Sequence, residues 1–261
     1  MTVQELANIG KPDVPAQYMV RGHHDQQLAM AVAEPIPAID PRRCGAAADE
    51  ASKLRSALES WGIFHLSNHG IEATMMDGMM SASREFFWRP LEDKQRDVLH
   101  VFTKKCGRVK DDLLQAMAKL LDLDNDDYFV DQLGEKAETN VRCSYYPQCP
   151  RPELVCGLKP HCDGTVLTIL MVDDSVGGLQ VLRDGVWWDV PIVPRTLLVI
   201  IGDQTEIMSN GFFKSPVHRV MTNAKKEKLS VALDYSVDHE REIEPLPQLI
   251  NEKRPALYMK S

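Results

Sequence analysis

The chain has 261 residues, of which 44% are hydrophobic and 26% are charged. These values describe an ordinary globular protein that is long enough to bury a sizeable core. The formal net charge of −8 at pH 7 argues against nucleic acid as a partner, because phosphate binding needs a basic surface.

The sequence shows no targeting pattern and no structural cysteine pattern. Its first residues lack the basic and apolar regions of a signal peptide, and no apolar run approaches membrane-spanning length. The six cysteines form no C-x-x-C pair, so zinc-ribbon and thioredoxin-like interpretations have no support. We therefore expect a cytoplasmic protein with free thiols and no membrane association.

The N-terminal part of the chain is expected to begin with a short strand and a helix. Residues 36–40 are predicted to form the strand. Leu54, Leu58 and Trp61 follow at spacings of four and three. This spacing places them on one face of a helix that ends at Gly62.

A second strand and two further helices are predicted next. The strand covers Ile63–Leu66, and a helix runs from about Ala73 to Phe87. Its large apolar residues are predicted to be core: Met75, Met76, Met79, Met80, Phe86 and Phe87. The following helix has an apolar stripe made of Leu113, Leu114, Met117, Leu120 and Leu121.

Short apolar runs separated by turn residues dominate the second half of the chain. The predicted strands are Val166–Val172, Gly178–Leu182, Val186–Val190 and Thr196–Ile201. The Asp184-Gly185 pair is typical of a tight hairpin turn. Such a series of short strands indicates a closed or double-sheet β-scaffold.

Two histidines and one aspartate lie at the two ends of this strand series. His161 and Asp163 are separated by one residue, so in an extended segment their side chains point the same way. His218 lies 55 positions beyond Asp163. Two imidazoles and one carboxylate are the ligand set that holds non-haem Fe(II). Taken alone, the H-x-D spacing is common by chance. The competing interpretation is that His161 and Asp163 are surface polar residues and that His218 is a structural histidine.

A series of ordered motifs extends from about Ile36 to Tyr258. The motifs are Ile36–Asp40, Trp61–Ile71, Tyr145–Pro150, His161-Cys162-Asp163, Gly177–Val181, Gly202-Asp203, Ser209–Gly211 and Ser215–Asn223. Together they resemble the plant 2-oxoglutarate/Fe(II)-dependent dioxygenases, the family that contains flavonol synthase, anthocyanidin synthase, and gibberellin and alkaloid oxygenases.

The resemblance implies an α+β protein with a mainly β core. The expected fold is a double-stranded β-helix of jelly-roll type, preceded by a helical N-terminal region. We expect the non-haem dioxygenase N-terminal region at residues 1–135 and the Fe(II)/2-oxoglutarate jelly-roll core at residues 136–261.

The resemblance also implies an oxidoreductase, with Fe(II) on His161, Asp163 and His218 and no catalytic residue beyond this centre. 2-Oxoglutarate and O2 are the expected cosubstrates, with ascorbate as a candidate addition. Release of succinate and CO2 would accompany hydroxylation or desaturation of a small plant specialised metabolite, such as a flavonoid or an alkaloid, or of a hormone. The expected partner is a small molecule, and the expected state is a monomer.

The cosubstrate site departs from the family pattern. The family binds the distal carboxylate of 2-oxoglutarate with Arg-x-Ser, whereas this chain has Lys228-Leu229-Ser230. Lysine keeps the charge but loses the planar two-point fork of arginine, so we predict weaker binding of 2-oxoglutarate. Tyr146 matches a tyrosine that donates to the same carboxylate, and Ser144 stands where an asparagine is usual.

A carboxylate occupies a position that usually lines the substrate pocket. Relatives commonly carry an aromatic residue at the position of Asp234. A carboxylate there is costly beside an aromatic substrate unless something pairs with it. Asp234 is therefore a candidate substrate-binding residue for a polar or cationic ligand, or its strand is no longer under functional constraint.

Five departures support an alternative function, and the complete set of three metal ligands opposes it. Three of the departures are Lys228, Ser144 and Asp234, and the other two concern missing segments. A block present in relatives is expected to be missing between about Arg96 and Asp97, and the chain ends soon after Tyr258. The alternative is a catalytically impaired dioxygenase-like protein that retains the metal-binding scaffold. A cupin-like zinc or sugar-binding module is disfavoured, because Tyr146 and Ser230 would then have no reason to accompany the three ligands.

Overall fold

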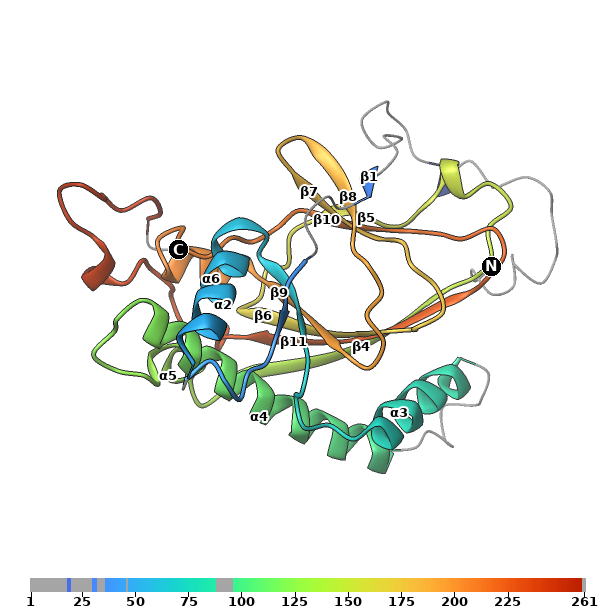
Figure 1. The fold of residues 1–261 in the computed structure, drawn as a ribbon, viewed down its shortest axis with the longest axis horizontal. Helices are drawn as coiled ribbons and strands as arrows, with labels where there is room; N and C mark the ends of the chain where they lie inside the picture. Colours follow the sequence, from blue (N-terminus) through green and yellow to red (C-terminus); the bar gives the residue numbers. More distant parts are fainter. Residues whose placement is uncertain (1–17, 20–29, 32–35, 46, 88–95, 260–261) are drawn as a thin grey trace.

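The computed structural model describes residues 18–19, 30–31, 36–45, 47–87 and 96–259. Two β-sheets face each other, and helices cover the outer face of one of them (Figure 1). The strands are β1 (Met30–Ala31), β2 (Ala38–Ile39), β3 (Ile63–Leu66), β4 (Glu138–Tyr146), β5 (Cys156–His161), β6 (Leu167–Val172), β7 (Leu179–Arg183), β8 (Val186–Asp189), β9 (Leu197–Ile201), β10 (His218–Met221) and β11 (Lys228–Ser236).

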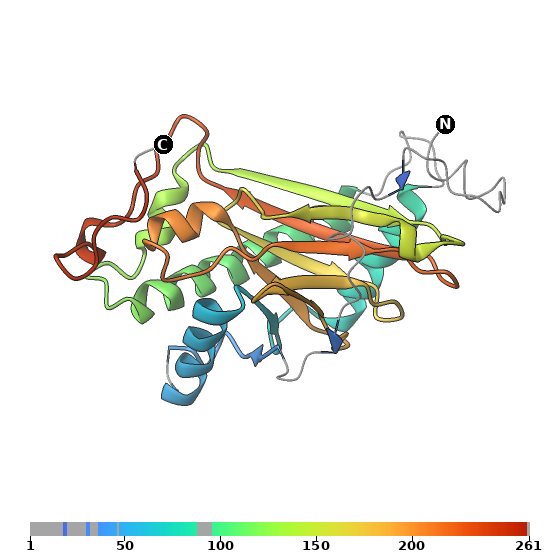
Figure 2. The same cartoon turned by 90° about the horizontal axis from the view of Figure 1, so that it is seen from above.

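The six-stranded sheet has the order β2-β3-β9-β6-β11-β4. Its longest pairing joins β11 and β4, which run antiparallel and side by side along the molecule (Figure 2). Strand β3 pairs antiparallel with β9, and the side chains of both strands are buried. Strands from the N-terminal part of the chain and from the predicted jelly-roll core therefore share one sheet.

The five-stranded sheet has the order β1-β8-β7-β10-β5. Strand β10 lies between β7 and β5, and it pairs antiparallel with both. The β7–β8 hairpin turns at Asp184 and Gly185, whose φ angles are 53° and 76°. Two consecutive positive φ angles are those of the tight turn that the Asp-Gly pair predicts.

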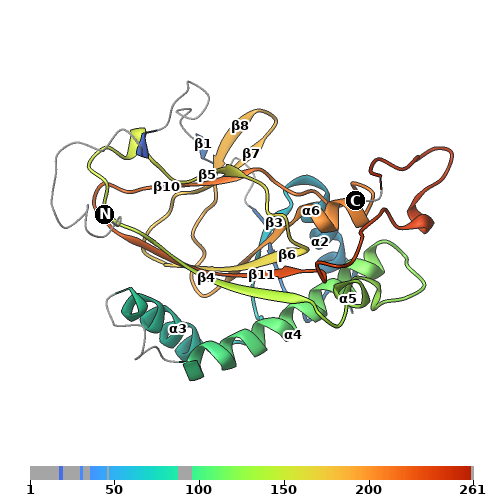
Figure 3. The ribbon, with the colours of Figure 1, turned by 180° about the vertical axis from the view of Figure 1, so that it is seen from behind.

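The helices lie along the six-stranded sheet and at one end of the molecule. They are α2 (Ala48–Ser60), α3 (Ala73–Phe86), α4 (Arg96–Leu120), α5 (Tyr128–Leu133) and α6 (Asp203–Met208), with 3₁₀ turns η4 (Pro152–Leu154) and η5 (Pro247–Leu249). Figures 1 and 3 show α3 and α4 along the outer face of β4 and β11. In the part of the chain that the structure describes, no helix is both long and apolar enough to cross a membrane.

The predicted apolar stripes are the buried faces of these helices, with one exception. All five residues of the predicted stripe are buried, although Leu121 directly follows α4. Met76 and Met79 of α3 are buried, and Met75 and Met80 are partly buried against the core. The prediction that Phe86 is core is wrong, because its side chain is 41% exposed. Phe86 is the last residue of α3, and the ring that contacts Tyr145 of β4 is that of Phe87, at 5.4 Å between centroids. Phe86 packs edge-on against Phe87 from outside.

The predicted strands of the second half are all present. Each of β6, β7, β8 and β9 begins and ends within one residue of its predicted bounds. Their order in two facing sheets is the arrangement expected of a jelly roll. The apolar residues of the two inner faces form one core.

Candidate metal centre and cosubstrate pocket

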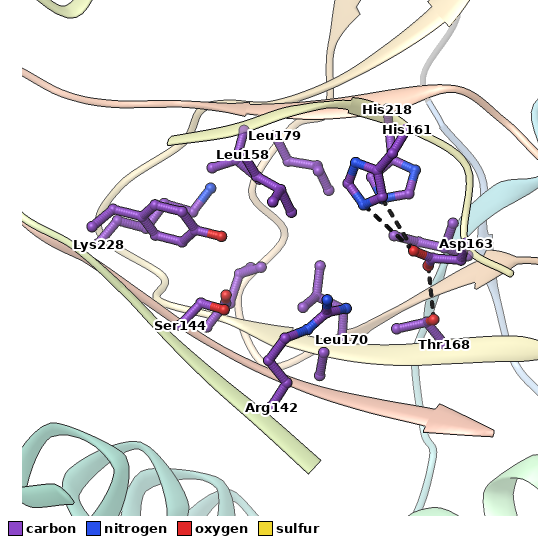
Figure 4. Close-up of a pocket in the computed structure, with 16 residues that line it drawn as sticks. Arg142, Ser144, Leu158, His161, Asp163, Thr168, Leu170, Leu179, His218 and Lys228 are labelled. Atoms are coloured by element: carbon purple, nitrogen blue, oxygen red, sulfur yellow. Dashed lines mark hydrogen bonds and ion pairs between the residues drawn. The ribbon is translucent and has the colours of Figure 1, made fainter. Parts of the chain in front are cut away.

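The three predicted ligands come together at one end of a pocket between the two sheets (Figure 4). Nε2 of His161 and Nε2 of His218 lie 3.6 and 3.7 Å from Oδ1 of Asp163. One donor atom from each residue lies within 4.8 Å of the other two. Such a cluster of two imidazoles and one carboxylate is the facial arrangement that suits Fe(II).

Strand pairing and one close backbone contact position these ligands. His161 ends β5 and His218 begins β10, and the two residues are directly paired across the antiparallel ladder. Asp163 lies two residues beyond β5, and its carbonyl accepts a hydrogen bond from the backbone N–H of Asp203, at 2.8 Å. The residue before Asp203 must be glycine. A Cβ at position 202 would lie 2.0 Å from the carbonyl oxygen of Thr165.

Hydrogen bonds on the far side of each ring fix the two imidazoles. Nδ1 of His161 lies 2.8 Å from the carbonyl oxygen of Lys159, and Nδ1 of His218 lies 3.1 Å from that of Pro216. A carbonyl can only accept, so Nδ1 carries the proton in both rings. The Nε2 lone pairs are therefore free and directed toward Asp163, which is how metal-binding histidines are usually oriented.

A threonine hydroxyl fixes the carboxylate in the same way. Oγ1 of Thr168 on β6 donates to Oδ2 of Asp163 at 2.7 Å. Oδ1, the oxygen that faces the two histidines, remains available. Outer hydrogen bonds of this kind orient ligands and adjust their basicity.

Burial keeps one ligand neutral. It lowers the pKa of the His218 imidazole, with the Asp163 charge acting in the opposite direction. A neutral imidazole is the form that binds metal. The thiol of Cys162, between the two ligands of the H-x-D triplet, faces the carbonyl of Ser215 instead, at 3.8 Å. The donor set present, two neutral imidazole nitrogens and one carboxylate oxygen, fits Fe(II).

The predicted cosubstrate residues lie at the opposite end of the same pocket, which has a volume of about 480 Å3 that includes open solvent. Lys228 and Ser230 of β11 pair with Tyr146 and Ser144 of β4, and all four line the pocket. Apolar side chains line the space between the two ends: Leu158, Leu170, Val172, Leu179, Ile200, Val220 and Ala232.

Lys228 is a buried cation without a fixed counter-ion. It is only 4% exposed, and among the described residues its ammonium makes no hydrogen bond or ion pair. Burial lowers the pKa of Lys228 to about 8, against the opposing effect of the Asp173 charge. Burial also raises the pKa of Tyr146, so its hydroxyl stays protonated and can donate a hydrogen bond.

The last predicted site residue, Asp234, is not among the residues that line the pocket. Its side chain is 15% exposed and forms an ion pair with Nη2 of Arg142, at 3.2 Å. Oγ1 of Thr168 lies 3.3 Å from its Oδ1. Asp234 thus has a cationic partner that the sequence analysis did not identify.

Sequence reasoning missed two residues of the site, Arg142 and Thr168. Arg142 lies two and four residues before Ser144 and Tyr146, and alternation along β4 would have placed it on the same face. Thr168 lies five residues after Asp163 at the start of a strand, and no local pattern predicts its bond to the ligand. Both line the pocket.

Comparison with known protein families gives two adjacent matches. Residues 36–138 match the model of the non-haem dioxygenase N-terminal region, described as that in morphine synthesis. Residues 137–236 match the model of the 2OG-Fe(II) oxygenase superfamily.

Individual relatives align over most of both chains. The chain is 30% identical to jasmonate-induced oxygenase 4 of Arabidopsis thaliana over 323 residues, which is 99% of this chain and 89% of the relative. It is 30% identical to codeine O-demethylase of Papaver somniferum (98% and 88%) and 32% identical to flavanone 3-dioxygenase 2 of Oryza sativa subsp. japonica (98% and 89%). The first alignment exceeds the 261 residues of this chain by 62 positions (323 − 261), so at least that many face gaps in this chain.

Solved structures share the fold. The crystal structure of JOX2 in complex with 2OG, Fe and JA superimposes with a TM-score of 0.89, at 28% identity, over 100% of this chain and 90% of that chain. The auxin dioxygenase AtDAO1 from Arabidopsis thaliana superimposes with a TM-score of 0.75 at 23% identity, over 84% and 99% of the two chains, and supports the fold alone. The expected double-stranded β-helix is confirmed.

Proposed function

Because the chain belongs to the 2OG-Fe(II) oxygenase superfamily, we propose that His161, Asp163 and His218 hold its Fe(II). The convergence of two free Nε2 lone pairs on Oδ1 of Asp163 carries this assignment. The bound iron supplies the oxidative chemistry that converts 2-oxoglutarate and O2 to succinate and CO2 while a substrate C–H bond is oxidised. The protein orients the three ligands through the hydrogen bonds to their far sides.

We further propose that Lys228, Ser230 and Tyr146 bind the distal carboxylate of 2-oxoglutarate. The buried ammonium provides the counter-charge, and the hydroxyls of Ser230 and Tyr146 provide donors beside it. A carboxylate bound there is shielded from solvent, so its attraction to Lys228 is stronger than it would be at the surface. The absence of the arginine fork predicts weaker binding than Arg-x-Ser would give.

The proposed substrate is a small plant specialised metabolite or hormone, which is hydroxylated or desaturated. The names of the relatives refer to jasmonate, codeine and flavanone, and the apolar side chains that line the pocket suit the mainly apolar bodies of such molecules. A monomeric, cytoplasmic protein without nucleic-acid or membrane partners remains our prediction.

Anaerobic titration of the purified protein tests the two binding assignments. Fe(II) is added first and 2-oxoglutarate second, and the visible charge-transfer band of the ternary complex is recorded. A band that saturates supports both sites. Iron binding without a band at high 2-oxoglutarate would contradict the role of Lys228, and failure to bind iron would contradict the metal assignment. His239→Ala is a matched control, because its ring is 67% exposed on the surface.

Succinate formation without added substrate separates the oxygenase from the catalytically impaired alternative. Uncoupled turnover requires only the iron and cosubstrate sites. We expect succinate to form in proportion to enzyme and to disappear in His218→Ala. A wild-type protein that shows the band but forms no succinate would favour the impaired alternative.

A further inference from the structure

Arg142 and Asp234 form an ion pair on the pocket side of the β4–β11 ladder. Arg142 pairs with Ala232 in this ladder, and Asp234 pairs with Asn140. The two charged residues are therefore diagonal neighbours, within reach of each other across the strands. Nη2 of Arg142 lies 3.2 Å from Oδ2 of Asp234 and 3.4 Å from its Oδ1.

The guanidinium of Arg142 has N–H groups that Asp234 does not use. Only Nη2 of Arg142 contacts Asp234, and within the described residues Nε and Nη1 have no hydrogen-bond partner. The side chain is 50% exposed, lines the pocket and extends into it from β4 (Figure 4). Arginine presents its N–H groups in a fixed fork that matches a carboxylate. The N–H groups that Asp234 does not use are therefore suited to a bound acid.

Arg142 is neither a proposed metal ligand nor one of the proposed 2-oxoglutarate residues. Its partner Asp234 contacts Thr168, and Thr168 contacts the ligand Asp163. Arg142 also lines the same pocket as the three metal ligands and the proposed 2-oxoglutarate residues. A molecule bound to its guanidinium therefore lies in the pocket that contains the metal centre.

Asp234, by contrast, is not available to a ligand. Both of its oxygens lie within 3.4 Å of Arg142, Oδ1 is also within reach of Thr168, and the side chain does not line the pocket. A carboxylate that is already paired and mostly buried gains little from a second cation. The sequence left open a cationic or other polar ligand at Asp234, and this geometry disfavours the cation.

We propose that Arg142 is a specificity-determining residue that receives a carboxylate of the prime substrate, with Asp234 as the positioning residue that holds the guanidinium toward the pocket. This inference rests on the proposed function, and it narrows the substrate class to small, mainly apolar acids. The acid binds the free N–H groups of Arg142, and its apolar body lies against the apolar lining of the pocket.

The test compares matched ligands on the anaerobic complex with Fe(II) and 2-oxoglutarate. The probes are 3-phenylpropanoic acid and its longer-chain homologues, each paired with its methyl ester and with the amine of equal length. Changes in the visible band on addition of a probe give its dissociation constant. We expect at least one acid to bind about 10- to 100-fold more tightly than its ester and its amine, the range expected for a charged hydrogen bond.

Variants then assign that preference to Arg142. Arg142→Met should reduce the affinity for the acid to that for the ester while the band with 2-oxoglutarate still forms, and Arg142→Lys should retain part of the preference. Arg151→Met is the matched control, because Arg151 is 51% exposed, pairs with Glu153 and does not line the pocket. In Asp234→Asn the acid should bind more weakly than in the wild type, because the ion pair that holds the guanidinium toward the pocket is lost. It should still bind more tightly than the amine, because the charge of Arg142 remains.

Each other outcome overturns the inference. It fails if no acid binds, if Arg142→Met leaves the affinity for the acid unchanged, or if an amine binds the wild type and is lost in Asp234→Asn. It also fails if Arg142→Met weakens 2-oxoglutarate instead of the acid, because Arg142 would then belong to the cosubstrate site. If the band never forms in the wild type, the metal and cosubstrate assignments fail, which is a distinguishable result.

Discussion

The two ends of the pocket are built in opposite ways. At the metal end each donor is held by a second hydrogen bond: the two imidazoles by the carbonyls of Lys159 and Pro216, and Asp163 by Thr168. At the far end Lys228 is buried with no hydrogen bond or ion pair among the described residues. The metal end is fixed in advance, and the far end keeps an unpaired charge.

This difference reflects what each end must bind. A metal ion requires ligands at defined angles. The supporting hydrogen bonds hold each ligand in that orientation. The distal carboxylate of 2-oxoglutarate requires a cation whose N–H groups are available to it. The far end therefore contains a desolvated ammonium, which lowers the stability of the protein as long as no ligand is bound.

Removal of a metal ligand should have the largest effect. His218→Ala leaves one imidazole and one carboxylate, and it should lower Fe(II) affinity by at least about 100-fold, more than loss of an outer hydrogen bond does, with loss of succinate formation. Equilibrium binding of Fe(II) under anaerobic conditions measures this. An affinity within a few-fold of the wild type would show that the ion is held elsewhere. His239→Ala should leave the affinity unchanged.

Removal of the unpaired charge should stabilise the protein without ligands. The pKa of Lys228 is about 8 in the fold and 10.5 in its ordinary state, which corresponds to a cost of up to about 3 kcal/mol at pH 7. Lys228→Met should recover much of this cost in denaturant unfolding at pH 7. The charged form is the disfavoured one, so the gain should shrink as pH rises from 8 toward 10.5.

A surface lysine provides the control for that experiment. Lys136 is 62% exposed and pairs with Glu240, so Lys136→Met should change stability little at any pH. Equal changes in the two variants would mean that Lys228 carries no burial cost. A loss of stability in Lys228→Met at pH 7 would mean that its ammonium has a favourable partner in the fold.

The outer hydrogen bond at the metal end should matter less than a ligand does. Thr168→Val keeps the shape but removes the bond to Oδ2 of Asp163, and metal affinity should fall about 10- to 100-fold. Thr168→Ser keeps the hydroxyl and should recover most of the affinity. If valine and serine behave alike, the threonine contributes packing alone, and the metal end is less fixed than its hydrogen bonds indicate.

The smallest expected effect is the pH dependence of 2-oxoglutarate binding. With a pKa of about 8, the charged fraction of Lys228 falls from about nine-tenths at pH 7 to about one-tenth at pH 9. Affinity for 2-oxoglutarate should therefore fall about tenfold over this interval, as measured by anaerobic titration of the iron-loaded protein. Lys228→Arg stays charged and should bind equally at both pH values. A flat profile in the wild type would place the counter-charge elsewhere.

Much of the metal end could be predicted from sequence because its signals are local. Two ligands of the H-x-D triplet lie two residues apart, and the third follows a recognisable strand series. Apolar runs between turn residues located these strands to within one residue. Lys228 and Ser230 were identified by their resemblance to the Arg-x-Ser motif of the family. The assignment of these residues as ligands and cosubstrate contacts stays a prediction until binding is measured.

The polar contacts of the pocket could not be predicted, because they depend on non-local register. Arg142 and Asp234 are 92 residues apart, and they meet only because β4 and β11 pair with Arg142 opposite Ala232. A shift of one residue would turn Arg142 to the other face of the sheet. The prediction for Phe86 was wrong for a related reason. The helical spacing was right, but the ring that reaches β4 is that of Phe87.

The position of β3 has a consequence for how this protein is made and divided. β3 is paired along its whole length with β9, and every residue of both strands is buried. A fragment beginning near residue 136 would expose the backbone edge and the apolar side chains of β9 to water. Open, apolar strand edges of this kind recruit other chains. We therefore expect such a fragment to aggregate during expression. The C-terminal jelly roll should become soluble only when it folds onto the N-terminal half, which is synthesised first.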